Sequence, residues 1–106
     1  MSRLHDLSPL TEGALYTLVA LDEPLHGYGI MQKVERMSNG RVKIGAGTLY
    51  GVLENLSRLK LIKPTGHDCG DRRKTYEITG DGKELLAIEV ARLEEMLANA
   101  RAALGR

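Results

Sequence analysis

A regular apolar repeat runs through the C-terminal quarter of the chain. Its members recur at spacings of four, three, four, three and four residues, which makes a heptad seam. They are Leu86, Val90, Leu93, Leu97, Ala100 and Leu104. Thr79 is a suitable N-cap, so we expect a helix from about Asp81 to the C-terminus, and about 24 helical residues extend roughly 36 Å. The other residues of a 106-residue chain are too few to cover such a helix. The heptad seam therefore predicts a partner helix, most simply from a second copy, with packing inside one chain as the alternative.

Two shorter helices are predicted nearer the N-terminus. The first begins at Ser8, which is a good N-cap, with Pro9 in the first turn where its missing N–H costs nothing. The second runs from about Gly27 to Met37, with Lys33 and Arg36 expected to face solvent. His26 is expected to cap this second helix or to pack beside it, and Tyr16 and Tyr28 are expected to pack in the core or between domains.

The stretch GAGTLYGVLENL, residues 45–56, predicts a third helix from about Ala46 to Leu59. Its apolar face consists of Leu49, Val52, Leu53, Leu56 and Leu59. The opposite face carries Thr48, Gly51, Asn55 and Arg58, with Tyr50 at one flank. A helix with one apolar face packs that face on a core and leaves the other exposed.

The glycines in this stretch fit either a phosphate-binding cofactor loop or a helix that meets the phosphates of DNA. The dinucleotide fingerprint is G-x-G-x-x-G after a strand of a βαβ unit. Here the spacing is Gly45-x-Gly47-x-x-x-Gly51, with Tyr50 where the third glycine belongs, and the Gly-Lys-Ser/Thr of a Walker loop is absent. No cofactor is therefore predicted. At a DNA interface the same glycines would allow a tight turn and a close approach of backbone N–H groups to a phosphate.

Residues 61–65 and 74–78 flank a polar, glycine-containing segment, which predicts a β-hairpin with a long tip. Two helices, a turn, a third helix and a hairpin follow the order of a winged helix-turn-helix, whose third helix enters the major groove. We therefore predict a mainly α protein with a small β-hairpin, of the α+β class. It comprises a winged helix-turn-helix DNA-binding domain over residues 1–79 and a long C-terminal dimerisation helix over residues 80–106, in one compact unit.

Basic charge is concentrated in the middle of the chain. The whole chain has a formal net charge of only +1, but residues 41–74 hold eight Lys and Arg against three acids. The eight are Arg41, Lys43, Arg58, Lys60, Lys63, Arg72, Arg73 and Lys74. Such a distribution suits one surface for a polyanion, and an uneven solvated surface is the alternative.

These motifs together resemble the PadR family of bacterial transcriptional regulators, across about residues 10–86. The matching pieces are His26-Gly27-Tyr28, Gly47-Thr48-Leu49-Tyr50, Leu53, Leu56, Leu59, Leu61-Ile62, Gly70, Arg72-Arg73, Tyr76, Thr79 and Gly82-x-x-Leu85. The resemblance implies a dimeric DNA-binding repressor of the small subclass, which has a single C-terminal helix. The sequence departs from the family pattern at two positions: Gly51 replaces a usual proline, and Gly29 replaces a larger residue.

The predicted DNA-binding residues lie on and around the third helix and the wing. They are Lys43, Gly47, Thr48, Tyr50, Gly51, Asn55, Arg58, Arg72, Arg73 and Lys74. Asn55 is suited to adenine and Thr48 to a thymine methyl group or a phosphate. The resemblance implies that Tyr50 meets the DNA backbone, and that the dimer interface joins Leu10 of the first helix to the heptad seam.

The resemblance also implies a small effector, either a phenolic acid or a hydrophobic drug, and the absence of tryptophan weakens the drug reading. A pseudo-palindromic operator and repression follow from the same resemblance. A winged-helix protein-interaction module without specific DNA binding is the alternative function.

Other functions have weaker support in the sequence. No motif brings a nucleophile, a base and an orienting group together, so no enzyme is predicted. His67 and Cys69 fall short of the usual four ligands of a structural metal site, so no metal is predicted, and a redox role for Cys69 stays open. The single cysteine suits a reducing compartment, and no apolar run is long enough for a bilayer or a signal peptide. We expect a cytoplasmic protein that makes no contact with a membrane.

Overall fold

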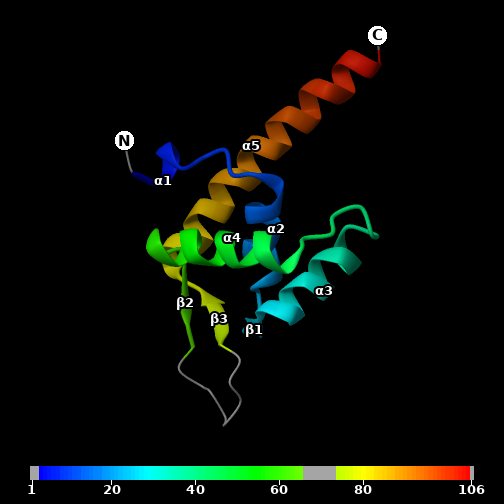
Figure 1. Cartoon of the computed structure of the whole chain (residues 1–106). Coiled ribbons are helices and arrows are strands. Elements are labelled where there is room, and N and C mark those ends of the chain that lie inside the picture. The colour runs from blue at the N-terminus through cyan, green and yellow to red at the C-terminus, as the bar shows by residue number, and fades with distance from the viewer. Residues whose placement is uncertain (1–2, 66–73, 106) are drawn as a thin grey trace.

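The computed structural model describes residues 3–65 and 74–105 of the chain. Within these two ranges, five helices and three short strands follow one another in the order α1, α2, β1, α3, α4, β2, β3, α5 (Figure 1). Their bounds are α1 Arg3–Asp6, α2 Glu12–Ala20, β1 Leu25–His26, α3 Gly27–Met37, α4 Ala46–Arg58, β2 Ile62–Pro64, β3 Thr75–Ile78 and α5 Gly80–Leu104. The predicted fold class, a mainly helical winged helix-turn-helix with a small β-hairpin, is confirmed.

The hydrophobic core lies where α2, α3 and α4 meet the start of α5. Leu18, Ile30, Leu53 and Leu85, one from each of these helices, are all fully buried. α4 places Leu49, Leu53 and Leu56 in this core, which is the apolar face that the sequence predicted. Aliphatic side chains therefore hold the four helices together, as a chain without Phe or Trp requires.

The sheet is antiparallel and has three strands in the order β1-β3-β2. β2 and β3 form the predicted hairpin, with Ile62 opposite Ile78 and Pro64 opposite Tyr76. The two-residue strand β1, which the sequence analysis missed, pairs Leu25 with Tyr76 on the other edge of β3. β1 runs directly into α3, so the sheet ties the wing to the start of the helix-turn-helix.

The prediction that the first helix begins at Ser8 is wrong. α2 begins at Glu12, and Thr11 is its N-cap, whose hydroxyl accepts a hydrogen bond from the N–H of Ala14 at 3.2 Å. The Ser8 hydroxyl instead donates to the carboxylate of Glu89 on α5, at 2.7 Å. Both Ser8 and Thr11 are good caps by type, so a distant carboxylate decides between them.

The first turn of α5 packs in close backbone contact with the wing, which is the β2–β3 hairpin and the residue before it. Thr79 is the predicted N-cap, and its hydroxyl accepts from Gly82 N–H at 3.0 Å and donates to the carbonyl of Lys60 at 2.7 Å. A Cβ at Gly82 would lie only 2.2 Å from the carbonyl oxygen of Leu61. Glycine is therefore required here by close approach of two backbones.

The second half of α5 extends away from the body of the molecule, as Figure 1 shows at the red C-terminal end. The heptad seam continues along this half, and Val90, Leu93, Leu97 and Leu104 are all exposed, the last by 86%. Met96, which the repeat did not include, is also exposed. A run of large apolar side chains on one projecting helix is an unpartnered surface within one chain. Within the described ranges, no helix is both long enough and apolar enough to cross a membrane.

Candidate nucleic-acid interface

The outer face of α4 is polar, exposed and formed by the predicted groove residues. Because Leu49, Leu53 and Leu56 point into the core, the residues on the opposite side of the helix point away from it. The exposed residues of this α4 outer face are Gly47, Thr48, Gly51, Glu54, Asn55 and Arg58. A helix that presents small and polar side chains on one exposed face has the chemistry to enter a major groove.

Asn55 and Arg58 contact each other on this face. A guanidinium nitrogen of Arg58 donates a hydrogen bond to the side-chain oxygen of Asn55, one turn earlier on the helix. The bond uses the side-chain oxygen of Asn55 and leaves both hydrogens of its amide nitrogen out of this contact. The two residues that the sequence proposed separately, as a base reader and a phosphate contact, therefore form one pair.

The glycines of α4 are not required by the fold of a single chain. A Cβ at Gly45, Gly47 or Gly51 would meet nothing within 4 Å. Gly45 is the N-cap with an ordinary φ of −71°, so the predicted glycine-dependent turn is wrong. Within the described residues the positive φ angles belong to Asn39, Gly40 and Lys60. Glycine in a helix interior costs about 1 kcal/mol relative to alanine, and no contact in the part of the chain that the structure describes explains that cost at Gly51.

The N-terminal turn of α4 has no side-chain cap. Gly45 offers no side chain to accept from the first N–H groups, unlike Thr11, His26 and Thr79 at the other helices. The first N–H groups of a helix need partners from outside it, and together they favour an anion. Lys43 lies just before this turn and is exposed.

A small hollow separates the first turns of α3 and α4. It has a volume of about 150 Å³ and is lined by Gly27, Tyr28, Met31, Ala46, Leu49 and Tyr50. We call it the tyrosine hollow, because Tyr28 and Tyr50 stand at it with 61% and 66% of their surfaces exposed. The expectation that Tyr28 is packed inside is therefore wrong, whereas Tyr16 does pack against the core.

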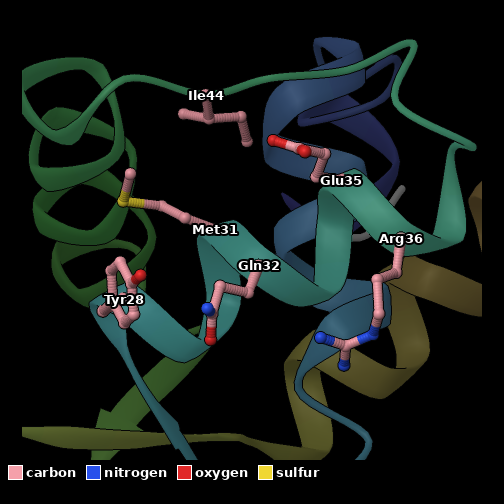
Figure 2. Close-up of a pocket in the computed structure, with 6 residues that line it drawn as sticks. All are labelled: Tyr28, Met31, Gln32, Glu35, Arg36 and Ile44. Atoms are coloured by element: carbon pink, nitrogen blue, oxygen red, sulfur yellow. The ribbon is translucent and has the colours of Figure 1, made fainter.

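In Figure 2, the Tyr28 side chain comes from the first turn of α3. The Met31 side chain reaches toward α4, and Ile44 comes from the connection between the two helices. These residues, with Gln32, Glu35 and Arg36, line a second and larger cavity of about 370 Å³ on the outer side of α3. Tyr28 and Met31 line both spaces, so α3 presents a continuous hollowed surface beside α4.

The basic residues of the predicted polyanion surface differ in their surroundings. Arg41 forms an ion pair with Glu12 at 2.9 Å, which raises the pKa of Arg41, and Lys63 lies 3.5 Å from Glu77. Lys74 is exposed beside β3. The predicted wing contacts Arg72 and Arg73, and the histidine and cysteine at 67 and 69, lie outside the described residues. No group of three potential metal ligands occurs within residues 3–65 and 74–105.

Two ionic networks were missed from sequence. The Glu89 side chain is 0% exposed and accepts hydrogen bonds from Ser8, from the N–H of Leu10 at 2.6 Å and from Arg92 at 2.7 Å. Burial alone would raise the pKa of Glu89, but these three donors outweigh it and hold the pKa below its ordinary value. Glu89 therefore fastens the N-terminal segment to α5 at the position where the heptad seam emerges.

The second network corrects the prediction that Lys33 faces solvent. Only 13% of its side chain is exposed, and its ammonium group donates to the carbonyl of Ala20 at 2.9 Å and to both Asp22 and Glu23. Burial lowers the pKa of Lys33, but the bonds to the two carboxylates outweigh burial and raise it. Lys33 joins the end of α2 to α3. The sequence signal that could have suggested this contact is the acidic pair Asp22-Glu23, eleven and ten residues before a helical lysine.

The arrangement of helices and hairpin defines a winged helix-turn-helix protein. Residues 15–88, more than half of the chain, match the model of the transcriptional regulator PadR-like family. The chain therefore belongs to the PadR-like family of transcriptional regulators, and the resemblance seen in the sequence is confirmed.

Two curated relatives match part of this chain. An uncharacterized 37.1 kDa protein in transposon TN4556 of Streptomyces fradiae is 37% identical over 79 residues, which cover 74% of this chain. An uncharacterized protein X of Lysinibacillus sphaericus is 33% identical over 69 residues, or 63% of this chain. The chain spans 22% of the length of the first relative and 63% of the second.

Solved structures support the fold. A PadR family transcription regulator from Clostridium difficile R20291 is similar with a TM-score of 0.74 and 22% identity, covering 89% of this chain and 99% of that one. A transcriptional regulator from Clostridium thermocellum gives a TM-score of 0.72 and 19% identity, with 86% and 90% covered. RosR of H. salinarum gives 0.68 and 22%, with 92% and 99% covered.

Proposed function

We propose that this protein is a homodimeric transcriptional repressor of the cytoplasm that binds a pseudo-palindromic DNA operator through α4 and releases it on binding a small effector. The observation that carries the proposal is the α4 outer face, which is exposed along its whole length and bears two glycines that the fold of one chain does not use. A groove edge that approaches the helix closely would make use of those glycines.

The proposed contacts follow the polarity of the face. Asn55, held by Arg58, and Thr48 would meet base edges, whereas Lys43, Tyr50 and Lys74 would meet the backbone. Arg72 and Arg73 of the wing are proposed backbone contacts on charge alone. Residues 1–79 would act as the DNA-binding part and residues 80–106 as the dimerisation part.

The proposed dimer uses the projecting half of α5. Leu93, Leu97, Ala100 and Leu104 would meet the same helix of a second copy, with Leu86, Val90 and Leu10 nearer the body. Met96 lies next to these residues and is added to the proposed interface. Two α4 helices carried by such a dimer would reach two half-sites of an operator.

The proposed effector would bind beside this interface. A cavity of about 300 Å³ lies between α2 and α5, with Leu15, Val19 and Leu93 as its apolar lining. Tyr16 and the Glu12–Arg41 ion pair complete it. A phenolic acid matches this lining, because its ring would meet the aliphatic groups while its carboxylate competed with Glu12 for Arg41. Effector binding and DNA release would then be coupled reciprocally.

A fluorescence-anisotropy titration tests the proposal. The protein is titrated against DNA from upstream of its own gene and against a scrambled duplex, at two salt concentrations. We expect tighter binding to the native duplex, weakening steeply with salt. Asn55→Ala should reduce the preference between the two duplexes, whereas Lys43→Ala should weaken binding to both equally.

Equal and weak binding to both duplexes would contradict specific DNA binding from that region and favour the interaction-module alternative. Arg72→Glu with Arg73→Glu separates these readings further, because a repressor loses DNA binding while its dimer stays intact. Sedimentation of the same variants reports the oligomeric state independently of DNA.

A further inference from the structure

Tyr28 is the large aromatic side chain on α3 that the core does not use. It lies in the first turn of α3, is more exposed than most of its neighbours, and shares the tyrosine hollow with Tyr50 of α4. Its ring stands edge-on to His26, with centroids 6.5 Å apart and planes at 72°. His26 in turn is held as the N-cap of α3 by the N–H of Gly29 at 3.0 Å. Tyr28 therefore has a ring contact with a residue that also caps its own helix.

Glycine at position 29 makes this arrangement possible. A Cβ there would lie 2.9 Å from the ring nitrogen Nδ1 of His26 and 3.4 Å from a methyl group of Leu25. The small residue lets the imidazole lie close over the first turn, where it both caps α3 and meets Tyr28. The departure of Gly29 from the family pattern thus has a structural use in this chain.

The tyrosine hollow has the size and chemistry for one step of a DNA backbone. At about 150 Å³ it is smaller than the roughly 300–1,000 Å³ of ordinary small-molecule sites. Its floor of Gly27, Met31 and Leu49 is apolar, which suits the carbon face of a deoxyribose. Tyr28 and Tyr50 also line it, and a phenol group donates a hydrogen bond without carrying charge.

The hollow also lies where a backbone is expected. In a helix-turn-helix whose second helix occupies the major groove, the first helix crosses the sugar–phosphate backbone. Here α3 is that first helix, and the hollow adjoins the α4 outer face, so its occupant is continuous with the proposed groove contact.

We propose that Tyr28 and Tyr50 bracket a single sugar–phosphate unit of the operator, with Tyr28 donating its hydroxyl hydrogen bond to the phosphate. The inference rests on the proposed DNA-binding function and adds to it a contact made by α3. Because a phosphate carries no sequence information, the contact strengthens binding without selecting bases. Because a phenol releases no counterion, it leaves the salt dependence unchanged.

The test compares Tyr28→Phe with the wild-type dimer on native and scrambled duplexes. One hydrogen bond to a charged phosphate is worth about tenfold in affinity, so a dimer that loses two should bind about a hundredfold more weakly to both duplexes, with the same salt slope. Tyr76→Phe is the matched control, because that tyrosine packs against the core from β3, and its affinity should stay within about twofold of wild type. Thermal unfolding of each variant reports folding separately.

Duplexes with one uncharged methylphosphonate, placed at each backbone position in turn, locate the phosphate. A methylphosphonate at the contacted position should lower the affinity of the wild type. It should leave the affinity of Tyr28→Phe, which is already weaker, unchanged. Wild-type affinity in Tyr28→Phe, or a loss confined to the native duplex, would overturn the inference. If the wild-type protein binds both duplexes equally, specific repression is contradicted, but the effect of Tyr28→Phe on that binding still tests the Tyr28 contact. If it binds neither duplex, both the proposed function and the Tyr28 contact are overturned.

Discussion

Gly82→Ala tests how closely α5 is set against the wing. The new methyl group would lie 2.2 Å from the carbonyl oxygen of Leu61 and 2.6 Å from Cγ1 of Ile78. Overpacking costs about 1–3 kcal/mol, and so short a contact with a backbone atom belongs at the upper end. Moving the helix away would also stretch the 3.0 Å bond from Thr79 N–H to the same carbonyl, at about 1 kcal/mol. Alanine has a better helix propensity than glycine, which offsets about 1 kcal/mol of this loss in stability.

The net loss is therefore about 3 kcal/mol, which lowers the melting temperature by about 10–15 °C for a domain of this size. Circular dichroism melts at one fixed protein concentration measure it, because a dimer melts in a concentration-dependent way. Gly80→Ala is the matched control, since it lies in the same turn and its Cβ would meet nothing within 4 Å. That variant should melt at or slightly above the wild-type temperature. Equal melting temperatures for the two variants would refute the close-approach reasoning.

Three further predictions concern α4 and α5. Gly51→Ala should raise stability by about 0.5–1 kcal/mol in thermal melts, because its Cβ is unopposed, and should weaken operator binding in anisotropy titrations; tighter operator binding would contradict a close groove contact. Leu97→Glu should give a monomer by sedimentation, whereas Glu94→Gln, on the same exposed half of α5, should remain dimeric. Glu89→Gln should be less stable than wild type at pH 7. Since the pKa of Glu89 is lowered in the fold, that difference should shrink as the pH falls through about 4 and below, in denaturant titrations at each pH; a difference that is independent of pH would argue against an ionised, buried carboxylate.

Local patterns in the sequence were enough to predict α3, α4, the hairpin and α5. The period of the apolar residues predicted the helices and the strands, and at the start of α5 the cap Thr79 agrees with it. The start of α2 could not be predicted in the same way. Ser8 and Thr11 are equally good caps by type, and the bond from Ser8 to Glu89, which is 81 residues away in the chain, decides between them.

The candidate interface was predictable only in part. The α4 outer face follows directly from the helical period, so Thr48, Gly51 and Asn55 were found. Tyr28 was missed because an aromatic residue near a helix start suits a core as well as a surface, and only its 61% exposure separates the two. Lys33 and Glu89 were missed because a charged residue on an amphipathic helix is ordinarily solvated, whereas here each meets donors or acceptors from another helix.

Because α5 is uninterrupted, the way its first turn packs on the wing fixes the direction in which its last turns face. Its first turn is locked to the wing at Gly82, and its last turns carry the exposed end of the heptad seam. One residue inserted between Glu89 and Leu93 would turn that end by about 100° around the helix axis and aim it away from its present direction. Seven inserted residues would restore the direction to within about 20° while lengthening the helix by about 10.5 Å. Only insertions that approach whole turns therefore keep the exposed seam in its present direction.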